Sequence, residues 1–448
     1  MDFSADKLAR LNKAREIETL PRAAIDQYHR SQLPNSVAIT VKAPFWRERF
    51  REAGVDPASL KDPRDLYAAP AITKADYFAA LSGDPEHYGG LLTEDLQSIR
   101  KRGAIVYHTS GTSGKQGRFI NTLEDFNVFS AQGAELIRVA GGSPGDSVLI
   151  VFPLTFWAAG WGFCHGARLG HFCLLPAGAP ADTTMRINLI RQYRPKIVVS
   201  TPSYALVLGS AARDMGVDLG ACGVSGLLIG GETFGKSKRD RIEALWGIPG
   251  GTRNFYGISE GGPLFAVECE AQDGLHLFEG DTIHQFWRPG LSEPAAPGEL
   301  AEHVFTSISQ SVMVTWFNFR TRDGAFYSDE PCSCGRKTRR MWIAERLDDM
   351  VKIKGVNIFA SGVEELLAEI KGISPEFRLV AEQVAHRDVL TLQIEPLDQA
   401  ERHALVELIK RKMLDAWNMH FEVECVAAGT LPRTELKARR WLDKRPKE

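Results

Sequence analysis

Residues 107–119, YHTSGTSGKQGRF, gather hydroxyl side chains, glycines and two basic side chains in one short segment. The glycines would let the backbone approach an anion, and the hydroxyls with the cations of Lys115 and Arg118 would contact a phosphate. The glycine spacing fits neither the G-x-x-x-x-G-K-[ST] nor the G-x-G-x-x-G phosphate motif. A flexible turn rich in serine and glycine explains the segment equally well, so this segment alone does not establish a phosphate site.

Three further clusters each place a carboxylate at the end of an apolar run. GGETF contains Glu232, FYGISEGG contains Glu260, and NFRTRDG contains Asp323. Ligands of open parallel sheets bind beyond the carboxyl ends of the strands, so these carboxylates are candidates for a binding site. Each one alone is equally consistent with a helix cap, a turn or a solvated surface position.

Composition places the chain among ordinary globular proteins. A chain of 448 residues is too long for one compact core, so we expect two or three domains. A formal net charge of −2 favours neither a nucleic-acid partner nor a membrane surface. The charged N-terminal stretch lacks the apolar core of a secretory signal. We therefore expect a cytoplasmic protein, in which the seven cysteines are thiols or metal ligands rather than a disulfide framework.

The elements that would position these clusters alternate between strands and helices from about residue 104. GDSVLIVFP, HFCLLPA, PKIVVSTP and VSGLLIGGE are typical of short strands, with helical segments between them. This alternation predicts βαβ units and a mainly parallel sheet. Residues before 104 are mainly helical in pattern. Since AIVYH is a strand candidate and a helical segment follows, residues 107–119 are expected to form a strand-to-helix loop.

The expected fold class is α/β, with a large N-terminal domain over residues 1–346 and a small α+β domain over residues 347–448. The large domain combines mainly parallel sheets with a β-rich lobe at about 260–345. The boundary falls near ERLDDM.

Six motifs in order resemble those of the adenylate-forming superfamily of acyl-CoA synthetases, peptide-synthetase adenylation domains and luciferase. TSGTSGK resembles its phosphate loop, YGISE its aromatic-Gly-x-[ST]-Glu motif, and FRTRD its ribose motif. ERLDDMVKIKGVNIF resembles the hinge, and LPRTELKARR the terminal motif that carries a catalytic lysine. With the opening helices APFWRERFREAGVDPASLKDPRDLYAAPAITKADY, the motifs most resemble the phenylacetate-CoA ligase family over nearly the whole chain.

This resemblance implies a two-step, AMP-forming acid–thiol ligase. A carboxylate attacks the α-phosphate of ATP, and after the mobile C-terminal domain rotates, a thiol such as that of CoA displaces AMP. The implied phosphate contacts are Thr109, Ser110, Gly111, Thr112, Ser113, Gly114, Lys115 and, at the α-phosphate, Ser259. The implied adenosine contacts are Gly230, Gly231, Glu232, Tyr256 and Gly257 at adenine, and Asp323 and Arg346 at ribose. Glu260 would bind Mg²⁺, Lys437 would neutralise the bridging α-phosphate oxygen, Asp348 would be the hinge, and Gly355 would line the thiol tunnel.

The phosphate loop departs from the superfamily pattern at its end. It reads Lys115-Gln116-Gly117-Arg118 where Pro-Lys is common, so Arg118 is a candidate substitute cation.

The acid pocket is expected in FPLTFWAAGWGFCHGARLG, which resembles the wall of the acid site in this family. Candidate contacts are Phe152, Phe156, Trp157, Trp161, His165 and the more distant Tyr204. An aromatic acid such as a benzoate or an arylacetate suits these rings, although each ring alone is as readily a core residue.

A metal site is expected in the β-rich lobe. Cys269, His276, Cys332 and Cys334 offer three thiolates and an imidazole, which suit a structural Zn²⁺ with no open coordination position. Some relatives of the phenylacetate-CoA ligase type carry a zinc with similar ligands. Buried cysteines that bind nothing are the alternative.

Three readings of the function stay open. The first is a CoA ligase for an aryl acid. The second transfers the acyl group from the adenylate to a carrier-protein thiol, an amine or another acceptor. The third is a non-catalytic binding protein that retains the fold. A homodimer is expected from the resemblance alone.

Overall fold

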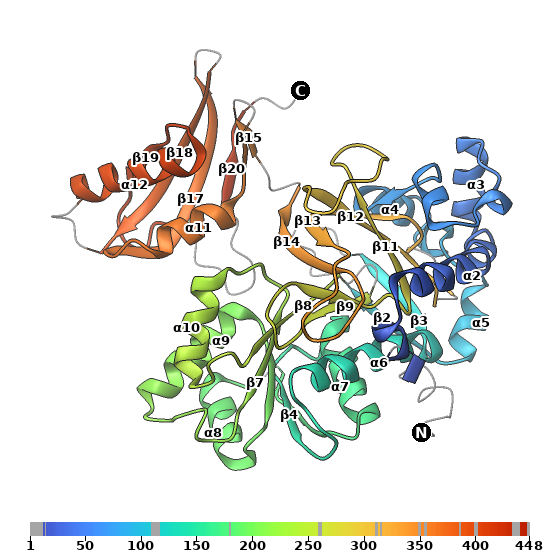
Figure 1. Cartoon of the computed structure of the whole chain (residues 1–448), viewed down its shortest axis with the longest axis horizontal. Helices are drawn as coiled ribbons and strands as arrows, with labels where there is room; N and C mark the ends of the chain where they lie inside the picture. Colours follow the sequence, from blue (N-terminus) through green and yellow to red (C-terminus); the bar gives the residue numbers. More distant parts are fainter. Residues whose placement is uncertain are drawn as a thin grey trace. The chain divides into compact units, whose positions relative to one another are not determined.

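A computed structural model describes residues 12–13, 15–108, 117–178, 181–258, 262–309, 312–313, 316–347, 351–353, 356–384, 387–397, 402–431 and 440–445. Contacts within the chain define two compact units (Figure 1). The first comprises Met1–Gly231 and Ile242–Ala344, and the second comprises Glu232–Arg241 and Glu345–Glu448. The predicted boundary of a mobile C-terminal domain, after Arg346, stays a prediction.

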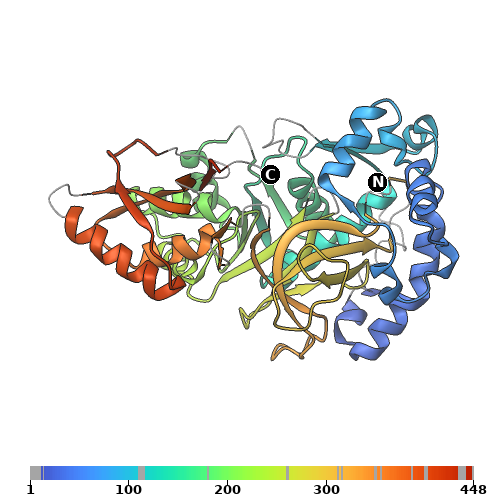
Figure 2. The same cartoon turned by 90° about the horizontal axis from the view of Figure 1, so that it is seen from above.

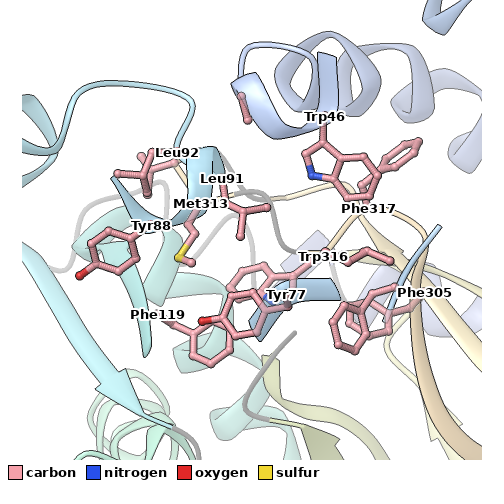
Figure 3. Close-up of a cluster of buried hydrophobic side chains, with 14 of the residues drawn as sticks. Trp46, Tyr77, Tyr88, Leu91, Leu92, Phe119, Phe305, Met313, Trp316 and Phe317 are labelled. Atoms are coloured by element: carbon pink, nitrogen blue, oxygen red, sulfur yellow. The ribbon is translucent and has the colours of Figure 1, made fainter. Parts of the chain in front are cut away.

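The helices before residue 104 pack around an aromatic core. They are α2 (Arg22–Thr40), α3 (Pro44–Ala53), α4 (Lys74–Gly83) and α5 (Leu96–Lys101), with the short 3-10 helices η1 (Pro57–Ser59), η2 (Pro63–Tyr67) and η3 (Tyr88–Gly90). Helix α3 has proline in its first turn and ends at Gly54, whose φ of 64° suits glycine. In Figure 3 the ring of Trp46 from α3 packs against Phe317, and that of Tyr77 from α4 against Phe119. The helical layer is thereby fixed to Phe119 and to Phe317, which both come later in the sequence.

Five strands form the parallel part of the main sheet. They are β4 (Ser147–Ile150), β5 (Cys173–Pro176), β6 (Ile197–Ser200), β7 (Gly226–Gly230) and β8 (Thr252–Ile258), in the spatial order β5-β4-β6-β7-β8. The helices that follow β4 to β7 are α7 (Ala158–Leu169), α8 (Thr183–Tyr193), α9 (Pro202–Asp214) and α10 (Lys236–Trp246). The predicted βαβ pattern and the α/β fold class are confirmed. Since β5 and β6 lie on opposite sides of β4, the strand order reverses there, and a ligand site is expected beside the carboxyl end of β4.

The β-rich lobe continues this sheet through antiparallel pairing of β8 with β9 (Gly262–Glu268). The order continues with β10 (Leu275–Leu277), β14 (Arg340–Arg346), β13 (Phe319–Ser328), β12 (Ala301–Ser307) and β11 (Thr282–Trp287). Strand β1 (Ile72–Thr73) adds to β13 in parallel. Both Figure 1 and Figure 2 show the N-terminal helices, in blue, beside β11 to β13, where Ser36 of α2 donates to the carbonyl of Ser307 at 2.8 Å.

The expected strand-to-helix loop at residues 107–119 instead connects two antiparallel strands. β2 (Ala104–His108) pairs with β3 (Arg118–Thr122), so that Tyr107 lies opposite Phe119. The physical reason is that the ring of Phe119 stacks on Tyr77 and Tyr107, with centroids 5.0 and 5.6 Å away, which holds the chain extended. Helix α6 (Leu123–Val139) begins only after Thr122, which caps it.

Helices α6 and α7 approach each other closely through glycine. A Cβ on Gly133 would lie 2.5 Å from the carbonyl oxygen of Gly162, and one on Gly166 would lie 2.5 Å from the nitrogen of Ala134. No side chain fits at these positions, so Gly133 of α6 and Gly166 of α7 are required by the packing of the two helices. The sequence pattern had not predicted helix α7.

Among its described residues, the second unit contains a four-stranded sheet, a two-stranded sheet, two complete helices and the first residues of α10. Strands β15 (Val351–Ile353) and β16 (Val356–Ile358) pair with each other. The larger sheet has the order β19 (Glu422–Cys425), β18 (Arg387–Pro396), β17 (Ile373–Val384), β20 (Trp441–Asp443). Helices α11 (Ala360–Ala368) and α12 (Arg402–Trp417) share with it a core that includes Val363, Leu392 and Ile409. Among the described residues of either unit, no helix is long and apolar enough to cross a bilayer.

Candidate active site

Many of the residues predicted for catalysis lie outside the described residues, and their roles stay predictions. They are Thr109, Ser110, Gly111, Thr112, Ser113, Gly114, Lys115, Ser259, Glu260, Asp348, Gly355 and Lys437. Among the described candidates for nucleotide binding, Gly230, Gly231, Tyr256 and Gly257 lie at the carboxyl ends of β7 and β8, and Asp323 lies in β13 of the β-rich lobe.

The carboxyl ends of β4, β7 and β8 bring predicted segments to one edge of the sheet. Gly230 closes β7, and a Cβ there would lie 2.4 Å from the carbonyl oxygen of Phe255. Gly231 follows with a φ of 84°, a conformation that favours glycine. Phe152, just after β4, packs its ring against Phe255 at a centroid distance of 5.8 Å. Gly230 therefore lets β7 lie close to Phe255 of β8, and Gly231 lets the chain turn at the end of β7, beside the strand that carries Tyr256 and Gly257.

Tyr256 and Asp323 meet inside the first unit although 67 residues separate them. The Tyr256 hydroxyl donates to Oδ2 of Asp323 at 2.6 Å, and Asp323 is only 7% exposed. The backbone amide of Asp323 donates to the Thr321 hydroxyl at 3.0 Å. The predicted adenine-side tyrosine and ribose-side carboxylate therefore form one hydrogen-bonded pair. Arg346 and Glu232 belong to the second compact unit.

A β-bulge between β12 and β13 directs the Asp323 side chain. Between the pairs Glu302↔Gly324 and Val304↔Arg320, one residue of β12 faces three residues of β13. Arg322 within the bulge has a φ of 63°, unusual for a residue other than glycine. Its backbone amide and its guanidinium both contact the fully buried carboxylate of Glu302, at 3.3 and 3.5 Å. Such bulges re-aim side chains at functional sites, which is what Asp323 requires here.

Three polar residues near Asp323 were not among the site residues predicted from the sequence. Glu302 and His303 lie in β12, a strand with six consecutive buried residues, and His284 lies in the equally buried β11. The sequence could have indicated them, because a charged residue and two histidines stand inside runs that are otherwise typical of buried strands.

The predicted acid-pocket residues differ in their surroundings. Phe152 is buried among Phe163 and Phe255, whereas Phe156 is 62% exposed and packs on His108 at 4.8 Å. Trp161 donates its indole N–H to the carbonyl of Thr155 at 2.8 Å. His165 packs its ring edge-on to Phe126 at 5.1 Å. The half-exposed rings of this segment therefore suit contact with a ligand better than Phe152 does.

Tyr204 is held by polar partners. Its hydroxyl accepts a hydrogen bond from the buried guanidinium of Arg186 at 2.6 Å and lies 3.0 Å from the hydroxyl of Thr183. Trp157 is the N-cap residue of α7.

The four predicted metal ligands converge. The ligand atoms of Cys269, His276, Cys332 and Cys334 all lie within 4.8 Å of one another. Sγ of Cys269 lies 3.7 Å from that of Cys332, and Sγ of Cys334 lies 3.4 Å from Nε2 of His276. Burial lowers the pKa of His276 to about 4, so its imidazole is neutral, the form that coordinates a metal. Three thiols and a neutral imidazole at this separation fit a tetrahedral ion such as Zn²⁺.

Arg118, the candidate substitute cation of the phosphate loop, has partners outside that loop. The guanidinium of Arg118 donates to the carbonyl of Pro85 and lies over the ring of Tyr88, 5.0 Å from its centroid. Its contact with a phosphate stays a prediction.

The fold is similar to that of solved acyl-CoA ligases. A 2-hydroxyisobutyryl-CoA ligase solved in its postadenylation state is 24% identical, with a TM-score of 0.84 over 96% of this chain and 92% of that one. An anthranilate-CoA ligase solved with anthranoyl-AMP is 17% identical, with a TM-score of 0.56 over 75% of this chain and 65% of that one. The fold is therefore that of the adenylate-forming enzymes.

Sequence comparison identifies the family. Residues 53–280 match the family described as AMP-binding enzyme, and residues 355–445 match the AMP-binding enzyme C-terminal domain. The phenylacetate-coenzyme A ligase of Thermus thermophilus is 30% identical, covering 96% of this chain and 99% of that protein. The Escherichia coli enzyme of that name is 29% identical, covering 90% of each. The chain belongs to the AMP-binding enzyme family, with phenylacetate-CoA ligases among its relatives, and the resemblance seen in its motifs is confirmed.

Proposed function

We propose that the protein activates an aromatic carboxylic acid with ATP and transfers the acyl group to the thiol of CoA. Full-length similarity to phenylacetate-CoA ligases supports the reaction class. The observation that carries the proposal is the hydrogen bond between Tyr256, near the carboxyl end of β8, and the buried Asp323, in the bulge of β13. A carboxylate suits the vicinal hydroxyls of ribose, and a neighbouring aromatic ring suits a base.

In the first half-reaction, the acid carboxylate attacks the α-phosphorus of ATP and pyrophosphate leaves. Negative charge grows on the phosphoryl oxygens, so donors and cations must surround them. We assign the triphosphate to the hydroxyls, amides and Lys115 of residues 109–115, the α-phosphate to Ser259, and the bridging oxygen to Lys437. Mg²⁺ held by Glu260 would neutralise further phosphate charge.

Adenosine recognition is assigned to residues at the end of the sheet. Adenine would be bordered by Gly230, Gly231 and Glu232, with Tyr256 and Gly257 beside it. Asp323 would accept hydrogen bonds from the ribose hydroxyls, with Arg346 as a second contact.

In the second half-reaction, the CoA sulfur attacks the acyl carbon and the bond to AMP breaks. Asp348 is the proposed hinge for the domain rotation between the two steps, and Gly355 the proposed wall of the thiol tunnel.

An aryl acid is the proposed substrate because rings line the segment after β4. Phe156, Trp157, Trp161 and His165 would contact the ring of the acid, with Tyr204 further along the wall. Phe152 would support this wall from the core, since it packs against Phe163 and Phe255.

The test incubates the protein with ATP, Mg²⁺ and a panel of benzoates and arylacetates, with and without CoA, and identifies products by mass spectrometry. We expect an aryl-CoA and AMP. An aryl-adenylate that accumulates despite CoA would instead support a carrier-protein thiol or an amine as acceptor. No acid-dependent AMP at all would support a non-catalytic binding protein.

We propose that Cys269, His276, Cys332 and Cys334 bind one structural Zn²⁺. The ion would tie β9 and β10 to the segment before β14. Metal analysis after dialysis against a weak chelator should give about one zinc per chain. The variant Cys334→Ser should lose the metal and melt at a lower temperature, whereas the exposed thiol variant Cys173→Ser should change neither. A metal-free protein of unchanged stability would contradict the site.

A homodimer and a cytoplasmic location complete the proposal. Both follow from the family resemblance and the composition, and gel filtration with light scattering tests the first.

A further inference from the structure

Two buried histidines lie behind the Tyr256–Asp323 pair. His303 of β12 is 0% exposed and His284 of β11 is 1% exposed. The rings of Phe265, Phe286 and Phe305 surround His303, with centroids 6.3, 5.8 and 6.0 Å from it. An apolar side chain would fill this space without a polar atom to satisfy. Both nitrogens of His303 and Nδ1 of His284 lie within hydrogen-bond distance of polar atoms, whereas Nε2 of His284 has no hydrogen-bond partner among the described residues.

The polar atoms form one continuous chain. Nδ1 of His284 lies 2.9 Å from Nε2 of His303, and Nδ1 of His303 lies 3.4 Å from the Tyr256 hydroxyl. The Tyr256 hydroxyl then donates to Asp323 at 2.6 Å. Every contact lies within the first compact unit, and the two imidazole rings are stacked with centroids 5.2 Å apart.

The direction of each hydrogen bond follows from the protons available. Burial lowers the pKa of His284 to about 3 and that of His303 well below its usual range, so both rings are neutral and carry one N–H each. Since the Tyr256 hydroxyl donates its proton to Asp323, we assign the Nδ1–H tautomer to His303, which can donate to the phenol oxygen. Nε2 of His303 then accepts from Nδ1–H of His284. All three donors point toward the carboxylate.

We infer that His303, supported by His284, is a positioning residue for nucleotide recognition. It holds the phenol of Tyr256 so that Tyr256 in turn orients Asp323 toward the ribose. Donation into the phenol oxygen also strengthens the bond that the phenol donates, because hydrogen bonds in a chain polarise one another. This inference rests on the proposed function, in which Asp323 binds the ribose hydroxyls.

The backbone provides a second connection that a side-chain substitution leaves intact. The Thr321 hydroxyl donates to the carbonyl of His303 at 2.7 Å and accepts from the amide of Asp323 at 3.0 Å. A change of the imidazole alone therefore preserves the bulge and tests only the path through Tyr256.

The experiment compares ATP with 2′-deoxy-ATP in the wild type and in His303→Leu, His303→Asn and Asp323→Ala. The readout is the ratio of kcat/KM for the two nucleotides in acid-dependent pyrophosphate exchange. A hydrogen bond to a carboxylate predicts a wild-type preference for ATP of about tenfold or more. We expect His303→Leu to lower that preference by about fivefold, with the KM of the acid unchanged, since the leucine cannot donate to Tyr256. His303→Asn, whose amide can donate to Tyr256, should retain most of the preference.

Phe305→Leu is the matched control, because it also removes an aromatic side chain from the buried face of β12. It should keep the nucleotide preference even if it lowers the melting temperature. An unchanged preference in His303→Leu, or an equal loss in Phe305→Leu, would overturn the positioning role. If Asp323→Ala also keeps the full preference, the ribose assignment itself is wrong. A loss in Asp323→Ala without a loss in His303→Leu rejects only the inference.

Discussion

Three neighbouring residues determine the position of Asp323. The left-handed backbone of Arg322 turns the strand, the buried carboxylate of Glu302 holds that turn, and the phenol of Tyr256 donates to the Asp323 side chain. A carboxylate that is 7% exposed is costly unless hydrogen-bonded, so these contacts are what make a charged group tolerable there.

At the residue scale, the buried histidines predict a pH dependence of stability. His284 has its pKa lowered to about 3 by burial, whereas in the unfolded chain it titrates near 6.5. Below pH 6.5 the unfolded state binds the extra proton, so stability decreases as the pH falls. Between pH 7.5 and pH 5, this one histidine should remove about 2 kcal/mol from the free energy of unfolding.

Urea unfolding of the wild type and of His284→Leu at both pH values checks this prediction. The variant should lose about 2 kcal/mol less than the wild type on acidification. The exposed His87, paired with Asp84, offers the control substitution His87→Leu, which should leave the acid-induced loss nearly unchanged. Equal losses in His284→Leu and the wild type would contradict the neutral, buried state of His284.

The metal cluster could be predicted from the sequence, whereas the contact between His284 and His303 could not. Cys269, His276, Cys332 and Cys334 were predictable because few roles other than metal binding require those residue types together. His284 and His303 were not, since a single histidine in an apolar strand is compatible with many surroundings. Only the pairing of β11 with β12, which places His284 opposite Phe305, brings the two rings together.

At the scale of the elements, α6 and α7 pack closely through glycine beside the predicted acid site. Gly133→Ala would place a Cβ 2.5 Å from the carbonyl oxygen of Gly162. This oxygen belongs to the backbone of α7, so it cannot rotate away as a side-chain atom could. We expect a loss of about 2 kcal/mol in unfolding free energy, together with a raised KM for the acid, because α7 carries Trp161 and His165.

Gly83→Ala is the matched control for this helix contact. Gly83 is the last residue of α4, and no atom lies within 4 Å of the position that a Cβ would occupy there. The substitution should be neutral or slightly stabilising. Equal stability of the two variants in thermal melts would show that α6 and α7 are not in close contact.

Strands and helices of strong pattern were predictable, and the errors have a physical cause. The runs that became β4, β6 and β7 are short, apolar and bounded by Gly, Pro or Ser, so their type is clear. The hairpin of β2 and β3 was missed because aromatic stacking of Phe119 decides the conformation after the loop. Helix α7 was missed because glycines are unfavourable in an isolated helix, whereas here the contact with α6 requires glycine at Gly166.

At the scale of the whole molecule, the two half-reactions should separate by mutation. Lys437 belongs to the C-terminal segment assigned to adenylation, where it would neutralise charge on the α-phosphate. Lys437→Ala should slow adenylate formation by about 100-fold while sparing thioester formation from a preformed acyl-adenylate. Single-turnover assays of each half-reaction measure both rates.

The control is Lys444→Ala, another lysine of the C-terminal unit, which pairs with Glu382. It should leave both half-reactions near the wild-type rate. If Lys437→Ala reduced both half-reactions equally, the lysine would not be specific to adenylation.

Acid-dependent exchange of labelled pyrophosphate into ATP, measured without CoA, tests the central claim most directly. This exchange requires the enzyme to form and reverse an acyl-adenylate, and it needs no knowledge of the acceptor. We expect benzoates or arylacetates to stimulate exchange well above the rate with short aliphatic acids. Exchange with aliphatic acids alone would contradict the aromatic pocket, and no exchange with any acid would contradict adenylation itself.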